Sequence, residues 1–143
     1  MHPEPRGPSI FISSTISGPH DLRSAVRYFL EQFGFEVFTS EHADFPHGVT
    51  QEAWRAGLEP IDRVDYYVLI VGDRYGALVD DGLSVTHHEL RRARERKGES
   101  GHPGMVFLIR RHVYEARGSL RIFSSPSQRW LTEVLSDQVG AQS

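Results

Sequence analysis

Three hydroxyl side chains and one glutamate are the residues of this sequence best suited to bind or cleave a small molecule. The stretch IFISST places Ser13, Ser14 and Thr15 directly after an apolar run, and Glu89 lies in the later segment GLSVTHHEL. Hydroxyls and backbone N–H groups at the start of a helix can hold a phosphate or a ribose hydroxyl. A glutamate facing them could act as a nucleophile or stabilise positive charge while an N-glycosidic bond is cleaved.

Each of these groups also has a purely structural interpretation. Ser13, Ser14 and Thr15 could form a turn that caps the following helix. Thr86 and Glu89 have the spacing of a capping box, in which a threonine caps a helix and the glutamate reaches back to it. The spacing alone favours this second interpretation of Glu89.

A further candidate group follows the apolar segment DYYVLIVG and consists of Asp73, Arg74, Tyr75 and Gly76. The tyrosine could stack on a base, and the arginine could meet a phosphate. The alternative is an exposed polar loop bounded by glycine.

Several other functions are not supported by the sequence. The chain has no P-loop, GxGxxG, HExxH or GxSxG motif and no cysteine, and its net charge of −3 disfavours a dedicated nucleic-acid binder. His87 and His88 point about 100° apart on a helix, which disfavours a shared metal ion. The basic run RRARERK is typical of a solvated helix face.

Strands and helices are expected to alternate along the chain. The expected strands cover residues 9–14, 35–40, 65–72, 105–110 and 121–125, and the expected helices cover 18–33, 50–61, 86–97 and 127–139. Apolar strands between helices indicate βαβ units and a parallel sheet covered on both faces. We therefore predict a three-layer α/β sandwich, a flavodoxin-like open sheet of about five strands. Ligands bind such sheets beyond the carboxyl ends of the strands, where all the candidate groups are expected.

The chain length of 143 residues indicates one domain. We expect a flexible leader at 1–8, a single domain at 9–139 and a short flexible tail at 140–143. No apolar run is long enough to span a membrane, and the absence of cysteine fits a cytoplasmic protein.

Several motifs in a fixed order resemble a known family. IFISST, SGPHDLRSAV, DRVDYYVLIVGDRYG, GLSVTHHELRRA and MVFLI are similar to domain-of-unknown-function family 4062, which is marked by a Ser-Ser-Thr motif. That family in turn resembles the Toll/interleukin-receptor (TIR)-like and nucleoside deoxyribosyltransferase-like superfamily. The similarity extends over about residues 9–110.

The resemblance implies roles for individual residues. Glu89 falls where the catalytic glutamate of the superfamily falls, and the substrate-binding candidates are Ser13, Ser14, Thr15, Asp73, Arg74, Tyr75, Gly76, Ser84 and Thr86. Deoxyribosyltransferases have an Asp-x-Gly-Thr segment shortly before the glutamate, whereas here Asp81 and Gly82 are spaced differently from Thr86. The resemblance therefore does not assign the aspartate that orients the ribose to a residue of this chain.

Two functions follow as expectations. The first is an N-glycosidase that cleaves NAD or a nucleotide as substrate, with no resident cofactor or metal, and that serves as a signalling effector, for example in bacterial antiviral defence. The second is a non-catalytic module at the N-terminus of a larger protein, which self-associates or binds partner domains. Neither expectation involves a membrane or nucleic acid.

Overall fold

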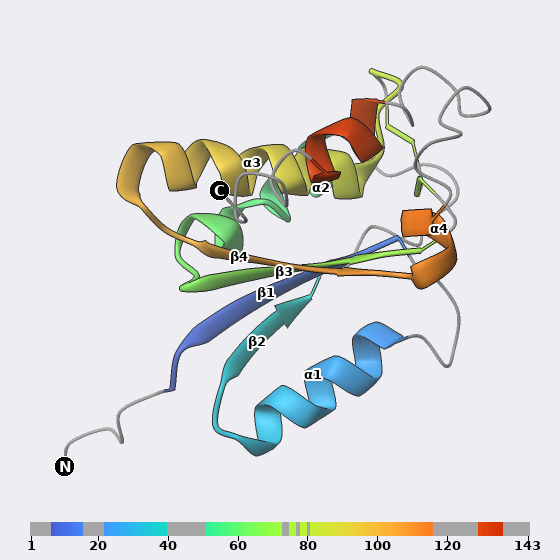
Figure 1. Ribbon diagram of the computed structural model, residues 1–143. Helices are drawn as coiled ribbons and strands as arrows, with labels where there is room; N and C mark the ends of the chain where they lie inside the picture. The colour runs from blue at the N-terminus through green and yellow to red at the C-terminus, as the bar shows by residue number, and fades with distance from the viewer. Residues whose placement is uncertain are drawn as a thin grey trace, which may run out of the picture.

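An open sheet of four parallel strands forms the centre of the fold (Figure 1). The computed structural model describes residues 7–15, 22–39, 51–72, 75–76, 78–79, 81–115 and 129–135. The strands are β1 (Ser9–Ser14), β2 (Glu36–Thr39), β3 (Tyr66–Val71) and β4 (Gly104–Ile109), and their order across the sheet is β2-β1-β3-β4. This sheet confirms the predicted flavodoxin-like α/β class, while the strand predicted at 121–125 lies outside the described residues.

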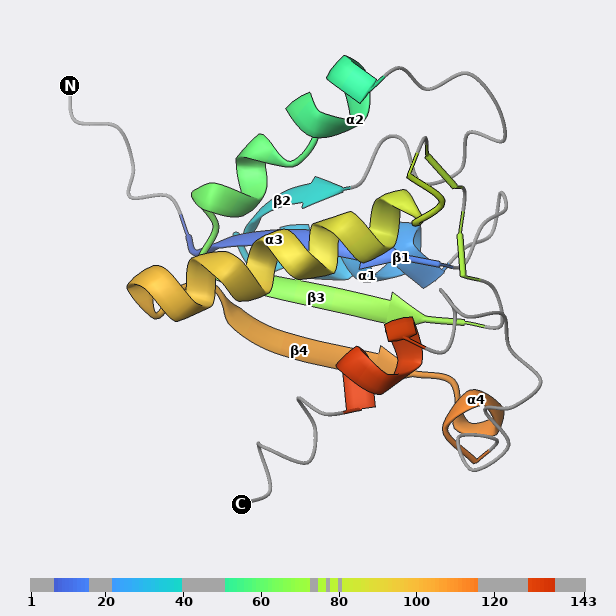
Figure 2. The same cartoon turned by 90° about the horizontal axis from the view of Figure 1, so that it is seen from above.

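Helices cover both faces of the sheet. They are α1 (Leu22–Gln32), α2 (Gln51–Ala56), a 3-10 helix (Glu59–Asp62), α3 (Val85–Ser100) and α4 (Arg111–Glu115), and residues 129–135 are helical as well. Helix α1 lies on one face, whereas α2, α3 and helix 129–135 lie on the other (Figures 1 and 2). No helix among the described residues is both long and apolar enough to cross a membrane.

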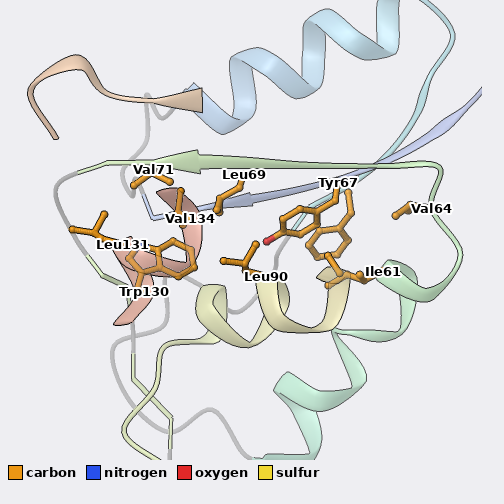
Figure 3. Close-up of a cluster of buried hydrophobic side chains, with 11 residues drawn as sticks. Ile61, Val64, Tyr67, Leu69, Val71, Leu90, Trp130, Leu131 and Val134 are labelled. Carbon is orange, nitrogen blue, oxygen red and sulfur yellow. The ribbon is translucent and has the colours of Figure 1, made fainter. Parts of the chain in front are cut away.

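The larger core lies between the sheet and α3. Alternate residues of a strand point to opposite faces, so Phe11 of β1 and Leu69 of β3 both point toward α3 and contact a cluster that includes Leu90. Helix 129–135 closes this cluster with Trp130 and its neighbours (Figure 3). The predicted helix at 127–139 therefore exists at least over 129–135, with the expected apolar side buried.

The face that carries α1 is covered less completely than the sequence predicts. Val26 and Leu30 pack on the sheet, but the large apolar side chains Phe29 and Phe33 of the same helix are 60% and 67% exposed. A buried stripe on a helix is about two residues wide, and only the row through Val26 and Leu30 contacts the sheet.

Strand β4 is a second correction, because it is not buried on both faces. Val106 and Leu108 are exposed, although their partners across the sheet, Val68 and Ile70, are buried. The buried cluster under α1 contains no residue of β4 among the described residues, so α1 does not extend over this edge of the sheet.

Candidate functional site

The carboxyl end of β1 is joined to the beginning of α3 by a buried hydrogen bond. The hydroxyl of Ser13 donates to Oε1 of Glu89 over 2.8 Å, although the two residues are 76 positions apart. Ser13 points toward α3 because it shares a face of β1 with Phe11, and both partners of the bond are almost fully buried. Two of the predicted site residues therefore meet.

The capping box predicted at Thr86 is wrong. The residue that caps α3 is Ser84, whose hydroxyl accepts a hydrogen bond from the backbone N–H of His87 at 3.0 Å. The helix begins at Val85, so Glu89 is its fifth residue and lies in the second turn, not the first. The glutamate is therefore not needed for the cap, and its side chain reaches β1 instead.

The other predicted hydroxyls hold the surrounding backbone. Thr15 accepts a hydrogen bond from the backbone N–H of Gly72 at 2.7 Å, and Thr86 donates to the carbonyl of Ser14 at 3.3 Å. All these residues are buried. They fix the relative positions of β1, β3 and α3 around Glu89, and their direct contact with a substrate stays a prediction.

A tyrosine hydroxyl completes the buried polar group. Tyr67 of β3 is fully buried, and its hydroxyl makes no hydrogen bond of good geometry with the described residues. Burial raises the pKa of Tyr67 well above its ordinary value, the Glu89 carboxylate raises it further, and the neighbouring Ser13 hydroxyl acts in the opposite direction. Figure 3 shows the Tyr67 ring in the core with its oxygen directed to the side of Leu90. The phenol therefore stays protonated beside the carboxylate.

Glu89 lines a pocket of about 330 Å³. The pocket lies beside the edge strand β2 and is bounded by Thr39 of β2, Trp54 of α2, Val85 of α3 and Arg27 of α1. Its volume is within the roughly 300–1,000 Å³ that is usual for small-molecule sites. The carboxylate thus lies against a cavity beside the carboxyl-terminal part of β2.

Trp54 supplies an unpaired donor to the wall of this pocket. Its side chain is 5% exposed, and its indole N–H has no hydrogen-bond partner among the described residues. One ring face stacks on His88, with the ring centroids 4.4 Å apart. A buried donor without an acceptor is costly, so a ligand or a water molecule that accepts from it would be favoured.

A second polar chain passes through the other side of α3. The Tyr75 hydroxyl lies 2.5 Å from Nδ1 of His87, and Nε2 of His87 lies 2.7 Å from Oε2 of Glu133. Burial lowers the pKa of His87 despite the opposing effect of Glu133. His87 is therefore a neutral ring that donates from Nε2 to Glu133 and accepts at Nδ1 from Tyr75.

Tyr75 and Gly76, two of the predicted loop residues, do not line the pocket that Glu89 lines. Tyr75 packs edge-on against Trp130 and uses its hydroxyl on His87. Gly76 has a φ of +109° and packs near Ser84 and Thr86 at the start of α3. Asp73 and Arg74 lie outside the described residues.

Three residues of the site are not predicted from the sequence. Tyr67 and Trp54 belong to apolar patterns, and Arg27 belongs to an ordinary amphipathic helix. The only signal in the sequence is that tyrosine and tryptophan carry polar atoms that require partners when they are buried. Among the described residues, no three His, Asp or Glu side chains are placed to hold a metal ion.

The fold and the site define an open parallel α/β domain with a buried carboxylate beside a pocket at the sheet edge. The chain belongs to the family described as domain of unknown function (DUF4062), whose model matches residues 9–117. No curated protein and no solved structure matches the chain.

Proposed function

We propose that the chain is a TIR-like domain that cleaves the N-glycosidic bond of NAD or a related nucleotide, with Glu89 as the catalytic carboxylate. The observation that supports this proposal most is that Glu89 is buried, bound by Ser13 and part of the wall of a ligand-sized pocket. A carboxylate is expensive to bury, and such groups in clefts are candidates for functional residues.

The chemistry requires few groups. The carboxylate of Glu89 would stabilise the positive charge that develops on the ribosyl carbon, or attack that carbon, as the bond to the nicotinamide nitrogen breaks. Water would then add its hydroxyl to the same carbon and release a proton, which gives ADP-ribose from NAD. Ser13 would hold the carboxylate in place through its hydrogen bond.

The experiment is to incubate the chain with NAD and measure nicotinamide release by chromatography. The assay uses the chain alone and the chain fused to a domain that forces its oligomerisation, because relatives in this superfamily act as assemblies. We expect Glu89→Gln to abolish release and Ser13→Ala to reduce it about 10-fold or more, the usual effect of removing a group that orients catalysis.

The matched control is Glu99→Gln, which removes a carboxylate on the exposed face of the same helix, where Glu99 pairs with Arg96. This variant should retain the full rate. Release that survives Glu89→Gln, or no release from either form of the chain, contradicts the proposal.

A second candidate function is a non-catalytic module that binds a second copy of the chain. It is favoured by the exposed rings of Phe29 and Phe33 on α1, whose centroids are 4.9 Å apart, and by exposed Val106 and Leu108 on β4. Exposed apolar patches, such as the pair formed by Phe29 and Phe33, often mark protein interfaces.

Sedimentation tests this second function. A dimer that dissociates when Phe29 and Phe33 are both changed to serine, but not when the exposed Leu78 is changed, supports it. A chain that stays monomeric at all concentrations excludes it.

A further inference from the structure

The pocket beside Glu89 has an uneven distribution of polar groups. Glu89 is the one acidic residue among the described residues of its lining, which also includes Arg27, Trp54 and Thr39, three residues that carry hydrogen-bond donors. A ligand that satisfies this lining presents hydroxyls to the carboxylate and hydrogen-bond acceptors to these donors.

Arg27 is well placed to bind an anion. Its Nε donates to Glu31 at 2.7 Å and its Nη1 donates to Thr39 at 3.3 Å, so side chains of α1 and β2 together hold the guanidinium of this pocket-lining residue. The side chain is half-exposed, and a guanidinium has five N–H donors, more than these two bonds use. An arginine presented in this way is suited to a phosphate.

Trp54 is the second and independent observation. Its indole N–H is buried and has no acceptor among the described residues, and stacking on His88 holds the ring in place. The ring therefore directs a fixed donor, which a neutral or anionic oxygen of a ligand would satisfy.

We propose that Arg27 and Trp54 bind the phosphate end of the ligand, so that the pocket selects phosphorylated ribosyl compounds over unphosphorylated ones. This inference rests on the proposed function, since it assumes that Glu89 faces the ribose. It adds two binding residues, one on α1 and one on α2, and a reason why the site would take nucleotides rather than free nucleosides.

The test compares the binding of ribose 5-phosphate, ribose and inorganic phosphate to the full chain by isothermal titration calorimetry. Glu89→Gln is titrated beside the wild type. We expect ribose 5-phosphate to bind at least about 10-fold more tightly than ribose, because hydrogen bonds between a guanidinium and a phosphate are charge-assisted and therefore strong. Arg27→Gln should remove this preference, and Trp54→Phe, which keeps the stacked ring, should weaken the binding of ribose 5-phosphate several-fold.

Arg23→Gln is the matched control, because Arg23 is the arginine one turn earlier on α1 and does not line the pocket. It should leave both affinities unchanged, and thermal melts of each variant show that it is folded. Equal binding of the two sugars, no binding of either, or equal effects of the Arg27 and Arg23 changes overturn the inference. Inorganic phosphate that binds as tightly as ribose 5-phosphate also overturns it, because the sugar would then play no part.

The two proposals fail separately. Arg27-dependent binding of ribose 5-phosphate without NAD cleavage removes the catalytic function and keeps the phosphate site. Glu89-dependent cleavage without a preference for the phosphorylated sugar keeps the catalytic function and removes the phosphate site.

Discussion

Oε2 of Glu133 lies 2.7 Å from Nε2 of His87, across the contact between helix 129–135 and α3. Arg91 donates to the other oxygen of the same carboxylate at 2.9 Å, and Arg94 donates to the backbone carbonyl of Glu133. Because His87 also accepts from Tyr75, one buried ring connects Tyr75 in the connection between β3 and α3, the first turn of α3 and the last described helix. Its charge state should therefore affect the stability of the whole domain.

The free energy of unfolding is expected to fall as the pH decreases from 7 to 5. Burial lowers the pKa of His87 in the folded state. The stability that the neutral ring contributes is therefore fully present above its unfolded pKa of about 6.5, and it is lost as the pH falls through the lower pKa of the folded state. The pKa of Glu133 is also lowered, through its bonds to Arg91 and His87 against the opposing effect of burial. The stability that Glu133 contributes is lost only at more acidic pH, below its unfolded pKa of about 4.3.

Urea denaturation at a series of pH values measures this effect. The His87→Gln variant should show a flatter dependence between pH 7 and 5, whereas His102→Gln, at an exposed position, should follow the wild type. Parallel curves for the wild type and His87→Gln would show that His87 is not the group responsible.

Ser13→Ala should destabilise the fold by about 1–3 kcal/mol, because it leaves the buried carboxylate of Glu89 without this donor. A double-mutant cycle with Glu89→Ala, which removes the acceptor, measures the interaction directly by chemical denaturation. We expect a coupling energy of about 1 kcal/mol or more, and a coupling near zero would mean that the hydrogen bond does not stabilise the native state.

Tyr67→Phe should leave the stability unchanged or raise it by about 1 kcal/mol, since it removes a buried hydroxyl that has no good partner among the described residues. Tyr75→Phe is the matched comparison, because it deletes a hydroxyl bonded to His87 and should cost about 0.5–1.5 kcal/mol. Thermal and urea unfolding of both variants measure the difference. A loss of stability in Tyr67→Phe as large as that in Tyr75→Phe would show that the Tyr67 hydroxyl has a partner in solution.

Arg92→Lys should destabilise the contact between α3 and the 3-10 helix. Arg92 donates from Nε and Nη2 to the two oxygens of Asp62, both at 2.7 Å, and a lysine cannot reproduce this paired geometry. The hydrogen bond from Arg92 lowers the pKa of Asp62 against the effect of burial, so the benefit is present above about pH 4 and is lost at lower pH.

We expect a loss of at most about 1 kcal/mol for Arg92→Lys, because both side chains are partly exposed. The loss should become smaller at high salt. A loss that does not change with salt would point to packing rather than to charge.

The sequence predicts the strands well where burial is complete. IFIS and YYVLIV are apolar on both faces because β1 and β3 are central in the sheet, and both strands appear where expected. MVFLI has the same pattern, yet β4 has one exposed face, because the pattern of a strand does not show how far a neighbouring helix extends. The exposure of Phe29 and Phe33 on α1 is unpredicted for the same reason, because a local pattern does not show how far the neighbouring element extends.

The candidate site was predictable only in part. The rule that ligands gather at the carboxyl ends of parallel strands correctly brings Glu89 near Ser13. The cap was misplaced because both Ser84 and Thr86 are good capping residues, and the glutamate three positions after Thr86 favoured the wrong one. Tyr67 and Trp54 were counted only as apolar residues, since local patterns do not show whether a buried hydroxyl or indole N–H finds a partner.

Helix 129–135 also extends the main core beyond the residues that match the family. It contributes Trp130, Leu131 and Val134 to the main core, although the family match stops at residue 117. A protein truncated at that boundary would expose the apolar faces of α3 and β3 to water and would leave His87 without its acceptor. The main core therefore includes residues beyond the family match, and a version shortened to residue 117 should be recovered as an aggregated or proteolysed chain.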